Sequence, residues 1–146
     1  MEMSKKEKPK VSIVIPIYKP DKEVLERVKE MIKKQTIKSE IIEMWNNPEA
    51  VSMNKGIKKA KGDIVVLLEQ DCVPENEHWL EKLISPLNKK IVASVSDLEL
   101  GEGYWKKYSL LTRILTVNEL ITRRPRIDIR ACAYEKKTLR KINYIS

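Results

Sequence analysis

Apolar residues along this chain form short continuous runs that alternate with stripes at helical spacing. The first run, 11–15, is rich in β-branched residues and stops at Pro16, which predicts a buried strand. Asp21 then precedes a stripe of apolar positions within 24–32, separated by lysines and glutamates. This spacing predicts an amphipathic helix that is capped by Asp21 and ends near Gln35.

The same alternation repeats in the next part of the chain. A second short strand is predicted at 40–44, and the Trp-Asn-Asn-Pro stretch at 45–48 indicates a turn. A helix is predicted from residue 49 or 50 up to Gly62, because glycine commonly terminates helices. The third strand is predicted at 63–68, where five apolar residues follow one another without a polar break. Such a run is typical of a strand buried on both faces.

A third helix and a fourth strand complete the regular part of the pattern. The helix is predicted from Asn76 to just before Pro86, since the residue preceding proline avoids the helical region. The strand is predicted at 91–95. Strict alternation of strands and helices favours an α/β fold, in which helices cover a mainly parallel sheet in three α/β/α layers with right-handed crossovers.

The pattern changes beyond Asp97. Aromatic and apolar residues at roughly helical spacing predict a helix within 104–122, followed by a strand at 127–133 and a short helix from Lys136. The length of 146 residues suits one domain, which we expect to span 11–146 after a disordered basic tail at 1–10.

Two carboxylates follow the third strand directly. Glu69 and Asp71 have one residue between them, so both side chains face one crevice if the extended backbone continues. Ligands of open α/β sheets bind beyond the carboxyl ends of the strands. Paired carboxylates there suit a hard cation such as Mg²⁺ or Mn²⁺ together with substrate phosphates. The alternative is that both acids simply begin a surface loop.

Charge is distributed unevenly along the chain. The formal net charge is +8, and all of this excess lies in 104–146, because 1–103 carry equal numbers of basic and acidic residues. An anionic partner is therefore predicted for 104–146. The candidates are sugar-nucleotide or lipid phosphates, an acidic membrane surface contacted peripherally, and nucleic acid, which we rank last.

Other sequence features argue against a membrane-spanning, secreted, disulfide-rich or zinc-binding protein. No apolar run reaches the roughly 20 residues needed to span a bilayer, and the lysine-rich start has no apolar segment behind it. Cys72 and Cys132 form neither a disulfide framework nor a zinc motif, and we expect them to fill apolar space in a cytoplasmic protein. His78 is expected to be solvated or to cap a helix.

Four stretches of the chain resemble the family-2 glycosyltransferases with the GT-A fold. They are VSIVIPIYKP, SEIIEMW, MNKGIKKAKGDIVVLLEQDCVPENEHWLEKL and ACAYEKKTLRKI, which together cover most of 11–142. The third stretch is the most specific, because helix, glycine, strand, acid-x-acid and Trp-Leu follow in the family's order. The resemblance implies a GT-A-like, Rossmann-like fold with a nucleotide-sugar-binding half at 11–100 and a basic acceptor-side segment at 101–146.

The resemblance also implies an activity and a site. Family members transfer a sugar, with inversion, from a nucleotide-diphospho-sugar to an acceptor, using Mn²⁺ or Mg²⁺ on the diphosphate. By position, Pro16 and Tyr18 line the nucleobase pocket. Glu69 is the first acid of the family's D-x-D motif, near the ribose and the metal, and Asp71 is the second, the metal ligand.

Several positions depart from the family pattern. Lys19 replaces a small polar residue, and Trp45 with Asn46 stands where a base-contacting Asp is usual, so these two residues are candidates to stack on and hydrogen-bond the base. The family's general base lies in an acidic motif downstream of the ACAYEKKTLRKI segment, and the printed sequence ends at Ser146 before such a motif. We expect a short, degenerate or C-terminally truncated member. Asp97 and Asp128 are the nearest remaining acidic candidates. Asp128 lies in an arginine-rich run and is expected to pair there, so we favour Asp97 as a donor or acceptor contact over a role as base, and the catalytic base is unassigned.

Three functions follow from these observations. The first is a metal-dependent glycosyltransferase of the hexosyltransferase class, whose acceptor is phosphorylated or lipid-linked. The second is a catalytically inactive GT-A-like module that binds nucleotides or partners. The third makes the basic 104–146 segment a surface for membrane or nucleic acid. We rank above this third function the alternative that Tyr108, Leu111 and Leu115 pack the helix on the sheet while the arginines are solvated.

Overall fold

The computed structural model describes residues 10–97, 109–114 and 130–144. The chain divides into two compact units, one made of 1–96 with 128–146 and the other of 97–127. In the second unit the described residues are Asp97 and 109–114, which include a helical stretch at 110–114. This stretch falls within the predicted helix at 104–122, the rest of which lies outside the described residues. Most of the predicted basic tail and the start of the predicted strand at 127–133 also lie outside them.

The first unit has the alternating elements that the sequence predicts. In chain order they are β1 (Val11–Ile17), α1 (Lys22–Lys33), β2 (Ser39–Trp45), α2 (Glu49–Lys59), β3 (Ile64–Leu68), α3 (Trp79–Ile84), β4 (Ala93–Val95), β5 (Ala131–Glu135) and α6 (Lys136–Lys141). Asp21 caps α1 as predicted, because its carboxylate accepts the N–H groups of Glu23 and Val24. All residues of β3 are buried, which confirms a strand covered on both faces.

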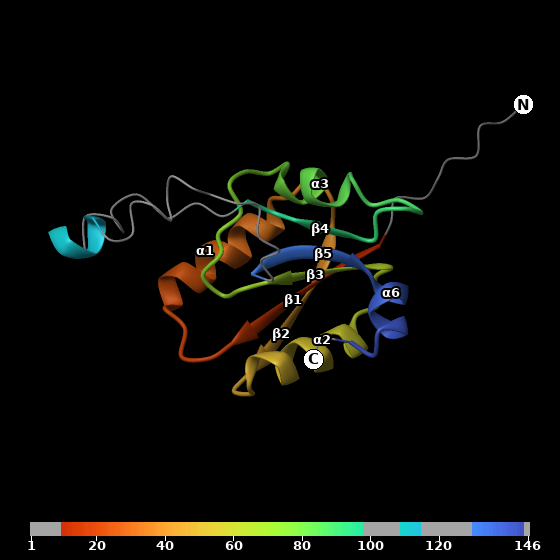
Figure 1. The fold of residues 1–146 in the computed structure, drawn as a ribbon, viewed down its shortest axis with the longest axis horizontal. Helices are drawn as coiled ribbons and strands as arrows, with labels where there is room; N and C mark the ends of the chain where they lie inside the picture. Colours follow the sequence, from red (N-terminus) through yellow and green to blue (C-terminus); the bar gives the residue numbers. More distant parts are fainter. Residues whose placement is uncertain (1–9, 98–108, 115–129, 145–146) are drawn as a thin grey trace, which may run out of the picture. The chain divides into compact units, whose positions relative to one another are not determined.

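The five strands form one sheet in the order β2-β1-β3-β5-β4 (Figure 1). β1 pairs in parallel with both β2 and β3. β5 is inserted between β3 and β4 and is antiparallel to each, so β4 runs in the same direction as β1, β2 and β3. The predicted mainly parallel α/β fold is therefore confirmed. The antiparallel insertion of β5 was not predicted, because it depends on pairing between distant segments.

Helices cover both faces of the sheet. α1 and α3 lie on one side, while α2 and α6 lie on the other (Figure 1). The core beneath α2 and α6 is one apolar cluster, made of Val14, Met44, Met53, Ile57, Ala60, Val65, Leu67, Cys132 and Leu139. Gly56 allows α2 to approach β1 closely, since a Cβ at this position would lie 2.2 Å from Cγ1 of Val14. Among the helices in the described ranges, none combines the length and apolar character needed to cross a bilayer.

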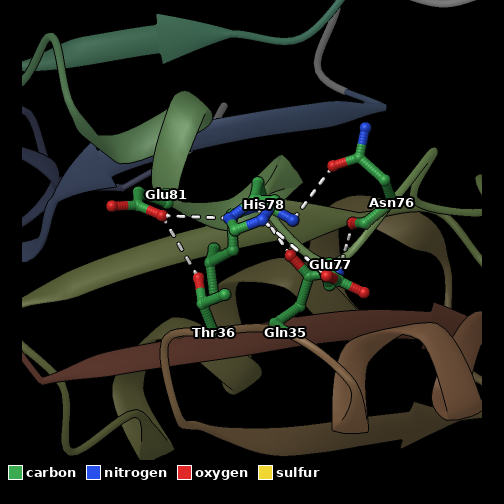
Figure 2. Close-up of polar contacts among 7 residues, drawn as sticks. Gln35, Thr36, Asn76, Glu77, His78 and Glu81 are labelled. Atoms are coloured by element: carbon green, nitrogen blue, oxygen red, sulfur yellow. Dashed lines mark hydrogen bonds and ion pairs between the residues drawn. The ribbon is translucent and has the colours of Figure 1, made fainter.

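A buried glutamine joins α1 to the segment that leads into α3. The Gln35 side chain is 2% exposed; its Nε2 donates to the carbonyl of Asn76 at 2.8 Å and its Oε1 accepts from the Leu80 N–H at 2.8 Å. Figure 2 shows this contact together with His78, whose exposed ring has Nδ1 3.4 Å from Oε2 of Glu81. The solvated position expected for His78 is confirmed.

A second polar network holds the turn between α2 and β3. The Glu40 carboxylate accepts the Ser12 hydroxyl at 2.5 Å and the Lys61 N–H at 2.6 Å, while the Gly62 N–H donates to Oγ of Ser12. These donors hold the pKa of Glu40 below its ordinary value of 4.5, with the Ser12 hydroxyl as the largest cause. The network therefore ties the start of β3 to β1 and β2.

We expect Gly56→Ala to lower the free energy of unfolding by about 2 kcal/mol, because the added methyl group overlaps Val14 and must push α2 from the sheet. Chemical denaturation measures the change. Adding Val14→Ala removes the atoms that the methyl group meets, so the double variant should lose less than the two single variants together. A Gly56→Ala protein as stable as the parent would contradict this packing.

Glu40 should make the free energy of unfolding depend on pH in the acidic range. A carboxyl whose pKa is lower in the folded state stabilises the fold above its unfolded pKa, and this contribution disappears as the pH falls from about 4.5 through the folded pKa. Glu40→Gln should cost about 1–2 kcal/mol near neutral pH and flatten the loss of stability below about pH 4.5. Urea unfolding across this range tests it, with Glu75→Gln, at an exposed carboxylate, as the matched control. Equal behaviour of the two variants would contradict the role of Glu40.

Candidate functional site

A cavity of about 560 Å³ opens at the carboxyl ends of β1, β2 and β3. It is lined by Pro16, Ile17, Tyr18, Asn46, Asn47, Pro48, Glu49, Glu69, Gln70 and Asp71. The chain passes from β1 to β2 on one side of β1, whereas β3 lies on its other side. Such a reversal of strand order is where open α/β sheets bind ligands.

Most of the predicted site residues meet in this cavity. Pro16, Tyr18, Asn46, Glu69 and Asp71 all line it. They come from three segments that are distant in sequence, so the sheet topology assembles the set.

Two predicted residues do not line the cavity. The Trp45 side chain is 46% exposed, and its Nε1 donates to Oε2 of Glu43 at 3.0 Å. Asp97 is exposed and belongs to the second compact unit. Base stacking by Trp45 and a substrate contact by Asp97 stay predictions.

The turn after β3 brings three possible metal ligands together. The Glu69 N–H donates to the Arg130 carbonyl at 2.8 Å, which extends the pairing of β3 with β5 by one residue. The Cys72 N–H then donates back to the Glu69 carbonyl at 3.1 Å, which closes a tight turn. As a result, one ligand atom each from Glu69, Asp71 and Cys72 lies within 4.8 Å of the other two.

This ligand set fits a divalent cation. Two carboxylates beside an open cavity suit Mg²⁺ or Mn²⁺, which also take ligands from substrate phosphates. The thiol of Cys72 adds a softer ligand, and its Sγ lies 3.9 Å from Oδ1 of Asp71. Cys72 is half-buried, so the expected role of apolar filler describes Cys132, which is fully buried, better than Cys72.

Gln70 is a site residue that the sequence analysis missed. Its Oε1 accepts the Tyr18 N–H at 2.9 Å, and its Nε2 donates to the Tyr18 carbonyl at 3.0 Å. The amide thus continues the pairing of β1 with β3 beyond the ends of both strands. The sequence held no signal for this contact, because 69–72 form a turn and the expected continuation of the extended backbone from β3 does not occur. All three residues, Glu69, Gln70 and Asp71, line the same cavity.

The loops after β1 and β2 supply an aromatic ring and amides. The Tyr18 side chain is 59% exposed, with Nζ of Lys19 5.3 Å from the ring centroid. Lys19 and Asn46 have positive φ angles of 44° and 57°, a region that is costly for lysine but tolerated by asparagine. The Asn46 N–H donates to the Ile17 carbonyl at 3.0 Å, which fixes this loop to β1. An exposed ring beside amides can stack on and hydrogen-bond a planar polar ligand.

Solved structures with the same fold bind sugar nucleotides. One is a mannosyltransferase from Pyrobaculum calidifontis in complex with GDP-Man and Mn²⁺, with a TM-score of 0.69 and 15% identity over 94% of this chain. Another is glucosyl-3-phosphoglycerate synthase from Mycobacterium tuberculosis in complex with Mn²⁺, UDP-Glc and phosphoglyceric acid, with a TM-score of 0.61 and 14% identity over 90% of this chain. The present chain spans 48% and 58% of those chains. No curated protein matches it in sequence.

The sequence profile of glycosyl transferase family 2 matches residues 29–141, which is most of the chain and includes β2, β3 and the acid-x-acid turn. The profile match agrees with the GT-A-like fold and with the resemblance found in the sequence. This chain therefore belongs to glycosyl transferase family 2.

Proposed function

We propose that this chain binds a nucleotide-diphospho-sugar and a divalent cation in the cavity at β1 and β3, and transfers the sugar to an acceptor hydroxyl with inversion. The observation that carries the proposal is the Glu69 and Asp71 pair, placed at the strand ends beside a cavity with room for a ligand. Membership of glycosyl transferase family 2 supports it, as do structural neighbours solved with GDP-Man or UDP-Glc and Mn²⁺.

Six of the lining residues have a role in this proposal. Asp71 and Glu69 hold Mn²⁺ or Mg²⁺, and Glu69 also faces the ribose. Tyr18 stacks on the nucleobase beside Pro16, and Asn46 hydrogen-bonds the base edge. Gln70 touches the Tyr18 backbone and acts as a positioning residue. Trp45 remains a second candidate for base stacking at the exposed end of β2.

The proposed reaction exchanges one bond at the anomeric carbon. The acceptor oxygen attacks this carbon from the face opposite the diphosphate, the bond from carbon to diphosphate oxygen breaks, and the acceptor proton passes to a base that is unassigned here. A bound divalent cation supplies stabilisation of the negative charge on the departing nucleoside diphosphate. Asp71 and Glu69 would contribute by holding the cation beside the cavity.

Donor binding and acceptor binding would be carried out by two different segments of the chain. We assign donor binding to 11–100 and the acceptor side to 101–146, within a domain spanning 11–146. Asp97, near the junction, is proposed to contact donor or acceptor. A phosphorylated or lipid-linked acceptor fits the basic charge of 104–146. An inactive nucleotide-binding module is the second candidate, because no general base is assigned among the described residues.

Binding of UDP and GDP should depend on Mn²⁺ and on Asp71. We expect Asp71→Asn to weaken metal-dependent binding at least tenfold, because it removes one of two charged ligands, an effect of about 1.4 kcal/mol or more. Asp63→Asn, the same change at the exposed residue just before β3, is the matched control. Calorimetric titration with and without Mn²⁺ measures both variants. Unchanged affinity in Asp71→Asn would refute the site, whereas binding without release of nucleoside diphosphate from any sugar nucleotide would favour the inactive module.

Gln70 should act through Tyr18. Gln70→Leu removes both hydrogen bonds to the Tyr18 backbone, so we expect faster exchange of the Tyr18 amide proton and nucleotide affinity lowered by about fivefold. Affinity for the metal alone should change little. Gln70→Glu keeps one acceptor for the Tyr18 N–H and should be intermediate. Loss of metal binding equal to the loss of nucleotide binding would indicate a collapsed turn instead.

A further inference from the structure

Helices α2 and α6 come from distant parts of the sequence but lie side by side on one face of the sheet (Figure 1). Ile57 of α2 and Leu139 of α6 belong to the same buried apolar cluster. Just beyond α6, the Tyr144 ring lies beneath Lys58, with Nζ 5.1 Å from the ring centroid. The Lys136 N–H also donates to the Asp63 carbonyl at 2.9 Å, which fixes the start of α6 against the turn that follows α2.

The outer side of this helix pair is strongly basic. α2 and α6 carry seven lysines and arginines against one carboxylate, Glu49, which lies at the far end of α2 beside the cavity. We define the α2–α6 basic surface as the exposed residues Lys58, Lys59, Lys137, Arg140 and Lys141. Two carboxylates lie near it: Glu135, which pairs with Lys137 at 3.2 Å, and Asp63 at the adjoining turn. Within the described part of the chain, the basic residues of this surface therefore outnumber the carboxylates near it.

The contrast with α1 shows that this surface is more than an ordinary solvated helix face. α1 is equally rich in charge, but it mixes both signs along its length. Lys29 lies 2.9 Å from Glu26 of the same helix and 3.3 Å from Glu43 of β2, so its charge is compensated by carboxylates nearby. The α2–α6 basic surface instead gathers like charges from two elements. Mutual repulsion there is relieved when an anionic partner binds.

The chemistry of the surface favours a membrane over nucleic acid. Ile142 follows the last basic residue of α6 and is 64% exposed, so an apolar side chain stands among cations. That combination suits a bilayer, where basic residues contact anionic headgroups and an apolar one enters the interface. Single-stranded nucleic acid binders add exposed aromatic rings for base stacking. On this surface the described aromatic residue, Tyr144, is partly buried and covered by Lys58.

We propose that the α2–α6 basic surface docks on a bilayer that contains anionic phospholipids. The inference does not depend on the sugar-transfer proposal, because it uses neither the cavity nor the acid pair. The two would nevertheless be linked by α2, since Glu49 lines the cavity and Lys59 ends the same helix, about 15 Å away along its axis. A lipid-linked substrate at the headgroup level would then lie within one helix length of the cavity.

The test is sedimentation of the full chain with vesicles of phosphatidylcholine alone or mixed with phosphatidylglycerol. We expect binding to the mixed vesicles only, and weaker binding as salt rises. The variant Lys59→Gln, Arg140→Gln, Lys141→Gln should lower partitioning by about a hundredfold, because each basic residue at an anionic surface contributes about fivefold. The matched control is Arg27→Gln, Lys33→Gln, Lys34→Gln, which removes the same charge from exposed positions in and just after α1. It should retain most of the binding.

Ile142→Ser gives an independent measure of insertion. We expect it to weaken binding severalfold without changing the salt dependence, because it removes apolar contact and no charge. Circular dichroism and thermal unfolding verify that all variants are folded. The proposal is overturned by equal binding to both vesicle types, by equal losses in the two triple variants, or by an α2–α6-dependent affinity for an RNA oligonucleotide in place of vesicles.

Discussion

The parallel pairing of β1 with β2 and β3 brings together the three segments that line the cavity, because 16–18 end β1, 46–49 follow β2 and 69–71 follow β3. The strand register determines which side chains meet in the cavity. Beyond the last paired residues, the Gln70 side-chain amide continues the contact by bonding both the N–H and the carbonyl of Tyr18. Gly56 supports this arrangement from the helix side, because its lack of a side chain lets α2 pack closely on β1. The site thus depends on backbone pairing more than on contacts among its own side chains.

Electrostatics separates two regions of the first unit. The acid pair after β3 concentrates negative charge at the carboxyl ends of the strands, although the chain as a whole carries +8. Among the described residues, α2 and α6 carry seven basic residues against one carboxylate. One helix, α2, therefore begins at the cavity and ends in the basic surface.

Local sequence patterns predicted much of this arrangement. The apolar run in β3 and the Asp21 cap each act over a few residues, so the elements from β1 to β4 could be located without a structure. The prediction that Gly62 terminates α2 was wrong, because the helix ends at Lys59 and Gly62 instead donates its N–H to Oγ of Ser12. Glu69 and Asp71 could be placed at a strand end for the same reason. The antiparallel place of β5, the Gln70 contact and the α2–α6 pairing could not, because each depends on residues that are distant in sequence. The sequence analysis predicted that Cys72 fills apolar space. Its thiol lies near both carboxylates because the Cys72 N–H closes a turn on the Glu69 carbonyl, and the sequence pattern did not indicate this turn.

We propose above all that the Glu69 and Asp71 pair holds a divalent cation inside the cavity beside Tyr18 and Asn46. Paramagnetic broadening of backbone amide signals by Mn²⁺, measured by NMR with UDP present, tests this claim most directly. The account predicts that signals from 16–18, 46–47 and 69–72 broaden first, while those of α6 remain sharp. Broadening centred on any other group of residues, or none at these positions, would contradict it.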